Sequence, residues 1–272
     1  MNAITGTPAG AFGYAAWVAM LAVLVLMLRV PTAYAQTDEI QVYDAQIAEP
    51  GVFNLTWHNN FTPDGLKQSE FPGGIVPNHA LNGVSEWAYG VAPWMEAGLY
   101  LPLYSVTSNG GLTFNGFKLR ALFVSPDAAD RVFFYGVNFE FSYNTAHWDQ
   151  SRYTQEIRPI LGWHLGAFDL IFNPILDNSY KGFGKLDFAP ASRIAYNLNK
   201  QWAMAVEEYA DLGPIDKFNG AGEQQHQVFA VFDYKGAVWN IEGGAGRGLT
   251  GTTDRLVLKL ILSRDLNRPA RQ

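Results

Sequence analysis

Short segments in which apolar and polar residues alternate make up most of this sequence, and this period of two constrains the fold more than any other feature. In residues 113–124, for example, apolar side chains alternate with Gly116, Lys118 and Arg120. Successive side chains of a β-strand point to opposite faces, so each such segment would have one apolar and one polar face. Clusters of Gly, Pro, Asn and Asp separate the segments, which is typical of an all-β sandwich or barrel.

Twelve principal strands follow from this pattern, and helical periodicity is weak and confined to residues 202–209. The predicted strands are 52–60, 84–91, 95–104, 113–124, 132–143, 153–163, 167–173, 186–198, 202–209, 227–234, 238–245 and 255–263. A further candidate strand covers residues 39–47.

The connections between these strands alternate in length. Short links at 92–94, 125–130, 164–166, 199–201 and 235–237 alternate with long links at 61–83, 144–152, 174–185 and 210–226, and links 105–112 and 246–254 are intermediate. Short turns at one end and long loops at the other are how outer-membrane barrels are built. We therefore predict a single antiparallel transmembrane β-barrel of about twelve strands, with both termini on the periplasmic side.

An amphipathic sheet in a soluble β protein shows the same alternation, with its apolar face turned inward. Two observations favour a membrane barrel over this alternative. Charged residues make up only 16% of the chain, against about 25% in average soluble domains. Aromatic residues such as Trp94, Tyr143 and Trp202 stand at the ends of predicted strands, where a membrane barrel has its interfacial girdles.

The first 35 residues differ from the rest. Residues 11–28 are an apolar run without charge, and Ala33-Tyr34-Ala35 supplies the small-x-small site of a signal peptidase. We predict a cleaved signal peptide over residues 1–35, although an apolar run of this length could also remain as a membrane anchor. Residues 36–50 would then form a periplasmic or lumen-inserted segment, and residues 51–272 the outer-membrane barrel.

Composition excludes several classes of site. The chain has no Cys, which excludes disulfides, thiolate catalysis and Cys-ligated metals. Its five His lie on separate segments without paired spacing, so no metal or cofactor is expected. With 19 Lys and Arg against 25 Asp and Glu, the chain lacks the basic footprint that a nucleic-acid partner requires.

Irregularities are expected at a few strand positions. Pro102, Pro159 and Pro190 lie within predicted strands, where proline cannot donate to the hydrogen-bond ladder, so bulges or strand ends are expected nearby. Glu207 and Glu208 are consecutive and would point to opposite faces of a regular strand. Either the strand bulges there or this part already lies above the membrane.

Several motifs stand in the middle third of the chain: Phe172-Asn173-Pro174-Ile175, Phe188-Ala189-Pro190-Ala191, Trp202, Glu208-Tyr209 and Gly213-Pro214. Together they resemble the central hairpins of bacterial outer-membrane β-barrels of the porin-like, phenol meta-pathway type. The resemblance implies an outer-membrane location, passage of small solutes, and outer-membrane lipid and the barrel assembly machinery as partners. Such barrels usually end on an aromatic residue that the machinery recognises, whereas here Leu262 is followed by the polar residues 263–272.

The charged residues on the inward face are the chemistry most informative about function. We predict that the lumen is lined by Lys118, Arg120, Glu140, Glu156, Arg158, Asp169, Lys185, Asp187, Arg193, Glu242, Arg255 and Lys259. Opposite charges facing each other across a narrow lumen would be partly desolvated, which favours pairing. They could form a salt-bridge network that fills the barrel, a polar constriction that selects solutes by charge, or both.

A passive channel for small solutes is the function that these patterns favour, with a structural envelope protein of closed lumen as the alternative. A third possibility is an outer-membrane lipid hydrolase, which needs His and Ser within hydrogen-bond reach. Its only candidates are His147 and Ser151, with Asn144, Asp149 or Gln155 to orient the imidazole. No catalytic residue is therefore assigned. The long link 61–83 would form either a lid or inserted constriction loop at the mouth, or a disordered surface loop.

Overall fold

The structure of the protein is a computed structural model that describes residues 39–268. The predicted signal peptide lies outside the described residues. Among the residues described, the only helices are the 3-10 turns η1 (Ala128–Asp130) and η2 (Phe183–Lys185). No helix in this part of the chain is long and apolar enough to cross a membrane.

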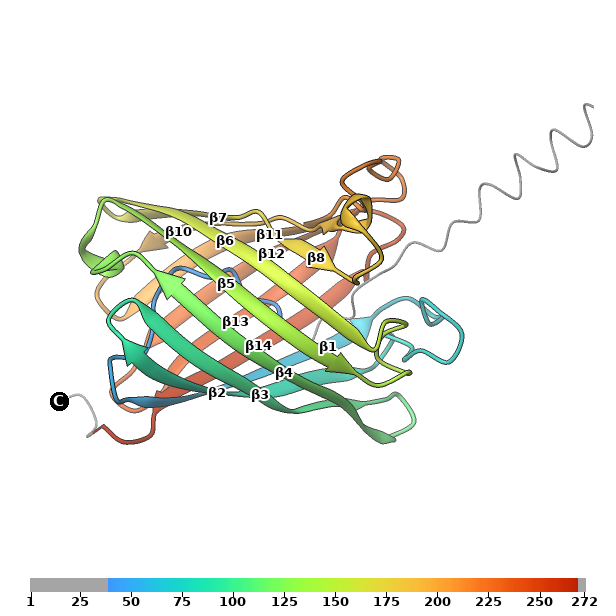
Figure 1. Cartoon of the computed structure of the whole chain (residues 1–272), viewed down its shortest axis with the longest axis horizontal. Helices are drawn as coiled ribbons and strands as arrows, with labels where there is room; N and C mark the ends of the chain where they lie inside the picture. The colour runs from blue at the N-terminus through green and yellow to red at the C-terminus, as the bar shows by residue number, and fades with distance from the viewer. Residues whose placement is uncertain (1–38, 269–272) are drawn as a thin grey trace, which may run out of the picture. The chain divides into compact units, whose positions relative to one another are not determined.

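The remaining elements are antiparallel strands that close into a barrel (Figure 1). They are β1 (Phe53–Asp64), β2 (Leu81–Ala92), β3 (Met95–Val106), β4 (Leu112–Val124), β5 (Phe133–Asn144), β6 (Tyr153–Leu165), β7 (Phe168–Asn173), β8 (Leu176–Asn178), β9 (Asp187–Phe188), β10 (Ala191–Asn197), β11 (Trp202–Asp211), β12 (Gln225–Lys235), β13 (Asn240–Gly248) and β14 (Leu256–Asp265). Strands next to each other along the chain pair, except that β7 and β10 pair directly and β8 and β9 pair with each other, and β1 pairs with β14 to close the sheet. The sheet therefore has no free edge along its main strands.

Two of the twelve barrel strands are each interrupted by a proline. β7 and β8 both pair with β6, and the register is the same on both sides of Pro174, as Leu161↔Phe172 and Ile157↔Leu176 show. β9 and β10 are likewise separated by Pro190 and continue one another. Proline cannot donate a ladder hydrogen bond, so pairing lapses at these points while the strand continues. Counted in this way, the described chain forms the predicted twelve-stranded barrel.

Of the other predicted irregularities, one disturbs the strand pairing and two do not. Pro102 lies where the β3–β4 register shifts, between Tyr100 and Leu103. Pro159, in contrast, pairs with Val137 in an unbroken register, because its missing N–H interrupts a single bond without displacing the strand. At Glu207-Glu208 the β11 pairing is also regular, so the two side chains do point to opposite faces.

Apolar side chains of the alternating strands point outward and charged side chains point inward, as expected for a membrane barrel. Phe139 and Leu258 are 37% and 41% exposed on the outer face, whereas Arg158 and Lys259 are 5% and 3% exposed on the inner face. Apolar side chains also occur inside, where Leu122, Phe134 and neighbouring residues form small buried clusters. The outer surface is thus apolar and aromatic, as a hydrocarbon environment requires.

The two ends of the barrel differ in their connections (Figure 1). We call the end at the right of Figure 1, with the connections 65–80, 107–111, 145–152, 179–186, 212–224 and 249–255, the long-loop end. The opposite end, with 93–94, 125–132, 166–167, 198–201 and 236–239, is the short-turn end. β1 begins and β14 ends at the short-turn end, so the predicted alternation in connection length holds, although 107–111 is short and 125–132 holds the turn η1.

Candidate functional site

Residues 39–50 run through the inside of the barrel, and we call them the luminal segment; they are the blue trace in Figure 1. The backbone of this segment is held by side chains of the wall. Asn173 Nδ2 donates to the carbonyl of Tyr43 at 3.1 Å, and the amide of Tyr43 donates to Asn173 Oδ1 at 2.8 Å. Arg158 Nη1 donates to the carbonyl of Gln41 at 3.0 Å. Buried backbone groups need such partners, so polar wall residues fix the path of the segment.

Gly90 permits the segment to leave the lumen at the short-turn end. A Cβ atom at this position would lie 2.1 Å from the carbonyl oxygen of Glu49, well inside van der Waals contact. The amide of Gly51 donates to the carbonyl of Gly90 at 2.8 Å. Glycine is therefore required where the segment crosses β2 and turns into β1.

Tyr43 is buried inside the barrel against the wall formed by β3 to β7. Its hydroxyl lies 2.6 Å from the hydroxyl of Tyr100 and donates to Glu140 Oε1 at 3.2 Å. The guanidinium of Arg158 lies 4.3 Å from the centre of the Tyr43 ring, within the range of a cation–π interaction. This ring and the segment around it therefore take up part of the interior of the barrel.

A first network of charges surrounds Tyr43, and we call it the Tyr43 cluster: Glu86, Glu96, Lys118, Arg120, Glu140, Glu156 and Arg158. Arg120 Nη2 pairs with Glu86 Oε1 at 2.6 Å and also with Glu96. Arg158 binds Glu156 with two parallel bonds, of 2.7 and 2.9 Å, which is the strong bidentate geometry of this pair.

A second network lies on the wall formed by β10 to β14, and we call it the Lys259 cluster: Arg193, Glu207, Asp233, Glu242 and Lys259. Lys259 pairs with Glu207 and, at 2.6 Å, with Glu242. Arg193 pairs with Glu207 and Asp233. Tyr209 donates to Glu207 Oε2 at 2.7 Å. Each buried cation here contacts at least two carboxylates.

The structure places the twelve predicted lumen residues in three groups. Buried inside the barrel are Arg120, Glu140, Arg158, Arg193 and Lys259. Half-buried are Lys118, Glu156, Asp169, Asp187 and Glu242. Exposed at the long-loop end are Lys185, in η2, and Arg255, in the bend before β14. These last two are not brought to the lumen, because the chain is outside the ladder at both positions.

Other predicted residues lie apart from the two clusters. Asp169 accepts from Asn197 Nδ2 at 2.8 Å and lies 2.6 Å from His164 Nδ1, at the short-turn end. Asp187 lies in β9 at the long-loop end. Whether any of the twelve residues lines a conducting path stays a prediction.

Sequence reasoning missed several members of these networks. Glu86, Glu96 and Asp233 were not among the predicted residues, although each is a charged residue at an inward position of a predicted strand. That position was a usable signal. Tyr43 had no signal of this kind, since its role depends on where an irregular segment passes.

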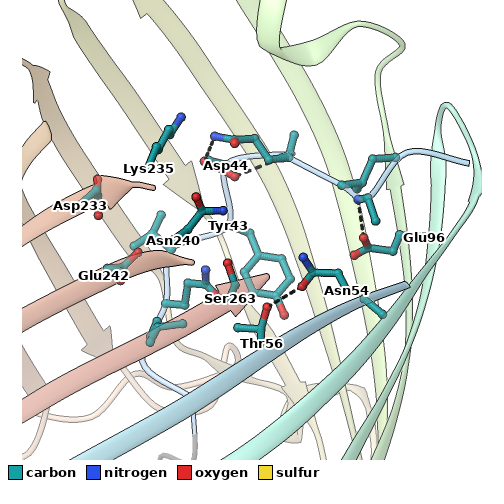
Figure 2. Close-up of a pocket in the computed structure, with 18 of the residues that line it drawn as sticks. Tyr43, Asp44, Asn54, Thr56, Glu96, Asp233, Lys235, Asn240, Glu242 and Ser263 are labelled. Carbon is teal, nitrogen blue, oxygen red and sulfur yellow. Dashed lines mark hydrogen bonds between the residues drawn. The ribbon is translucent and has the colours of Figure 1, made fainter. Parts of the chain in front are cut away.

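Two cavities lie on either side of the luminal segment, and Gln41 lines both. The turn-side cavity, about 330 Å³, is bordered by Asp44, Asn54 and Asp233 among others (Figure 2). The loop-side cavity, about 210 Å³, is bordered by Glu39, Lys118 and Trp148 among others. The segment thus divides a lumen that is not filled with side chains.

The connection 65–80 packs against other loops at the long-loop end. Ile75 is buried and its amide donates to the carbonyl of His147 at 3.2 Å, while the amide of Leu66 donates to Asp254 Oδ1 at 2.8 Å. Together with Ile40 of the luminal segment, this loop borders a small cavity of about 60 Å³. These contacts disagree with the predicted disordered surface loop, whereas a lid or inserted constriction loop stays a prediction.

Glu70 in this loop has an unusual environment. One of its carboxylate oxygens is buried without a hydrogen-bond partner. Burial, together with the nearby carboxylates of Asp254, Asp211 and Asp149, raises the pKa of Glu70 to about 8. The pKa values of Asp149 and Asp254 are also raised by burial, although each accepts a backbone N–H that acts in the opposite direction.

The comparisons with known proteins give the fold. No family model and no curated protein matches the sequence. Among solved structures, the chain is similar to the COG4313 outer membrane channel from Pseudomonas putida F1, with 12% identity and a TM-score of 0.55 over 84% of this chain and 100% of that one. The chain has the fold of an outer-membrane β-barrel channel. At this identity the likeness shows the fold alone.

Two other barrels are similar at lower scores. The CymD monoaromatic hydrocarbon channel has 6% identity and a TM-score of 0.47, over 85% of this chain and 95% of that one. The translocator domain of autotransporter NalP from Neisseria meningitidis has 10% identity and a TM-score of 0.46, over 96% of this chain and 100% of that one. The porin-like resemblance is confirmed at the level of the barrel, and the phenol meta-pathway type stays a prediction.

The residues proposed for a lipid hydrolase are engaged in other contacts. His147 Nε2 lies 3.1 Å from both Thr145 Oγ1 and Asn115 Oδ1. The amide of Ser151 donates to Asp149 Oδ1 at 2.6 Å. Within residues 39–268 no hydrogen bond joins the His147 and Ser151 side chains, and no group of three His, Cys, Asp or Glu could hold a metal ion.

Proposed function

We propose that this protein is an outer-membrane channel for small solutes, closed at rest by the luminal segment at Tyr43. The observation that carries the proposal is the pair of cavities on either side of this segment. A purely structural barrel gains stability from a filled interior, because close packing maximises contact. Here the turn-side and loop-side cavities remain on either side of the luminal segment, which is held mainly by side chains of the wall.

The charged side chains around Tyr43 support the proposal that solutes are selected by charge beside this residue. Arg120, Glu140 and Arg158 are arranged about the ring, and rings of fixed charge select polar solutes in narrow pores. The proposal includes outer-membrane lipid around the apolar exterior, removal of residues 1–35, and insertion by the barrel assembly machinery. The resemblance to the phenol meta-pathway type adds weakly hydrophobic molecules to the solutes proposed.

Planar-bilayer recording tests the proposal with two variants that displace the segment in different ways. Tyr43→Ala removes the aromatic ring, and Gly90→Val creates a clash with the backbone of Glu49 while Tyr43 is retained. We expect both variants to pass more current than the wild type. Tyr135→Ala serves as the matched control, because Tyr135 is an exposed outer-face tyrosine.

A heat-modifiability gel shows in parallel that each variant forms a closed barrel. If folded wild type, Tyr43→Ala and Gly90→Val are all silent, the channel function is refuted and a structural envelope role remains. If Tyr135→Ala raises the current as much as Tyr43→Ala, the segment is not the closure.

A further inference from the structure

The loop-side cavity carries an unbalanced set of charges. Its acidic lining residues are Glu39, Glu140, Asp149, Glu156, Asp177 and Asp211, and its basic lining residues are Lys118 and Arg158. Lys118 lies 3.7 Å from Glu140, and Arg158 binds Glu156 with two bonds. Both cations are therefore already paired, and the remaining carboxyl groups have no matching cation in the wall.

The carboxyl groups that remain are not equivalent. Asp149 accepts the amide of Ser151 at 2.6 Å, and Asp211 accepts the amide of Gly213 at 2.8 Å. These two groups are used to hold turns. Asp177 lines the cavity from β8, and its carboxylate accepts no hydrogen bond from another described residue.

Glu39 is the decisive residue of the cavity. Its side chain is 2% exposed, and neither carboxylate oxygen accepts a hydrogen bond within the described chain. The nearest cationic atom is Arg158 Nη1, at 4.0 Å, and that guanidinium is committed to Glu156. A buried carboxylate is costly unless donors reach it, and among residues 39–268 no cationic group donates a hydrogen bond to Glu39.

Part of the lining is apolar. Ile40, Ile175 and the buried Trp148 border the same cavity. A cavity of about 150 Å³ accommodates benzene, so about 210 Å³ has room for a ring with a short charged arm. One molecule can supply both a hydrogen-bond donor for Glu39 and an apolar part that packs against these side chains.

We propose that the loop-side cavity binds a small organic amine, with its ammonium group at Glu39 and its carbon body against Trp148 and Ile175. The inference deepens the proposed function, because it names the class of solute that the channel would take up. An anion is disfavoured since the wall cations are already paired. A divalent metal is disfavoured since no group of three acidic or His ligands converges in the described residues.

Calorimetric titration of the purified protein in detergent tests the proposal. Benzylamine is the probe, and benzyl alcohol and benzoate are neutral and anionic molecules of similar size. We expect benzylamine to bind about tenfold more tightly than either, since a hydrogen bond to a charged group contributes about that factor. Equal binding of the three molecules, or none by benzylamine, would overturn the proposal, as would displacement of benzylamine by equimolar Mg²⁺.

Two substitutions within the cavity locate the binding. Glu39→Gln is expected to weaken benzylamine binding about tenfold, as loss of a charged hydrogen bond does, and Asp177→Asn to weaken it in the same direction. Glu49→Gln is the matched control, because Glu49 is an exposed glutamate at the other end of the luminal segment. Unchanged binding in both cavity variants, or equal loss in Glu49→Gln, refutes the assignment. Should Glu39→Gln not form a barrel on the gel, Asp177→Asn decides.

Binding and conduction are measured separately, so the two proposals fail separately. Amine binding without current leaves the cavity assigned and refutes the channel. Current without amine binding leaves the channel and refutes the assignment of the cavity.

Discussion

Two regions of this barrel differ in whether their charged groups have ion-pair or hydrogen-bond partners. In the Lys259 cluster, Lys259 contacts Glu207 and Glu242, and Arg193 contacts Glu207 and Asp233. Toward the long-loop end, the buried Glu39 and the half-buried Glu70 each have at least one buried carboxylate oxygen that accepts no hydrogen bond from residues 39–268. The difference suggests two roles. The ion pairs of the Lys259 cluster stabilise the wall, whereas the carboxylates of Glu39 and Glu70 can bind a proton or a cation.

The largest expected effect concerns the paired region. Lys259→Ala leaves Glu207 and Glu242 without their shared cation inside the wall, and removing one partner of a buried pair costs about 3–5 kcal/mol. We expect the free energy of unfolding, measured by urea titration in detergent, to fall by that amount. Lys200→Ala, at an exposed turn position, should change it by less than about 0.5 kcal/mol.

A double variant sharpens this result. Lys259→Met combined with Glu207→Gln removes the charge of both partners. The loss of unfolding free energy in this double variant should therefore be smaller than the sum of the losses in the two single variants. Strict additivity would show that the Lys259 cluster is not coupled and would remove one side of the comparison.

An intermediate effect is expected in the unpaired region, from Glu70→Gln. The pKa of Glu70 rises from its ordinary 4.5 to about 8 on folding, so the folded protein retains a proton that the unfolded chain has released. Wild-type stability therefore falls as the pH rises from 4.5 to about 8. Thermal unfolding should show Glu70→Gln gaining stability relative to wild type across this window and little below it.

The groups that face Glu70 are the carboxylates of Asp254, Asp211 and Asp149. All three raise its pKa, so their ionisation strengthens the expected trend. Glu223→Gln, at an exposed position of the loop 212–224, is the control and should show no such gain. An advantage of Glu70→Gln that is constant with pH would mean that Glu70 is not a buried, protonated group.

The smallest effects are expected at the two exposed predicted residues. Lys185→Gln and Arg255→Gln should each change the free energy of unfolding by less than about 0.5 kcal/mol, as surface substitutions do. Bilayer current should stay at the wild-type level in both. A destabilisation as large as that of Lys259→Ala would place these side chains in the paired region after all.

The barrel could be predicted from local pattern because alternation is a property of each strand. Phe139 and Leu258 share their face with other apolar residues at every second position, so the apolar face was evident before any pairing was known. That this face points outward was favoured by the low charge and the aromatic strand ends, and the structure confirms it. The breaks at Pro174 and Pro190 were harder to place. A proline removes a ladder bond but does not say whether the register resumes beyond it, as it does in both strands here.

The candidate site could be predicted only in part. Arg158 and Lys259 were found as inward charges, but the ion-pair partners of Lys259 lie on β11 and β13 and depend on register and closure. Lys185 and Arg255 are charged residues next to strands, and alternation cannot tell where the ladder ends.

The sequence alone determined the class of fold, the number of strands and the side of the sheet that is apolar, since these follow from a period of two and from the length of connections. Tertiary structure decided that Tyr43 is buried inside the barrel, that cavities lie on both sides of the luminal segment and that no donor among residues 39–268 reaches Glu39. An irregular segment has no periodicity, so its path is set by contacts with wall residues distant in the chain, such as Asn173.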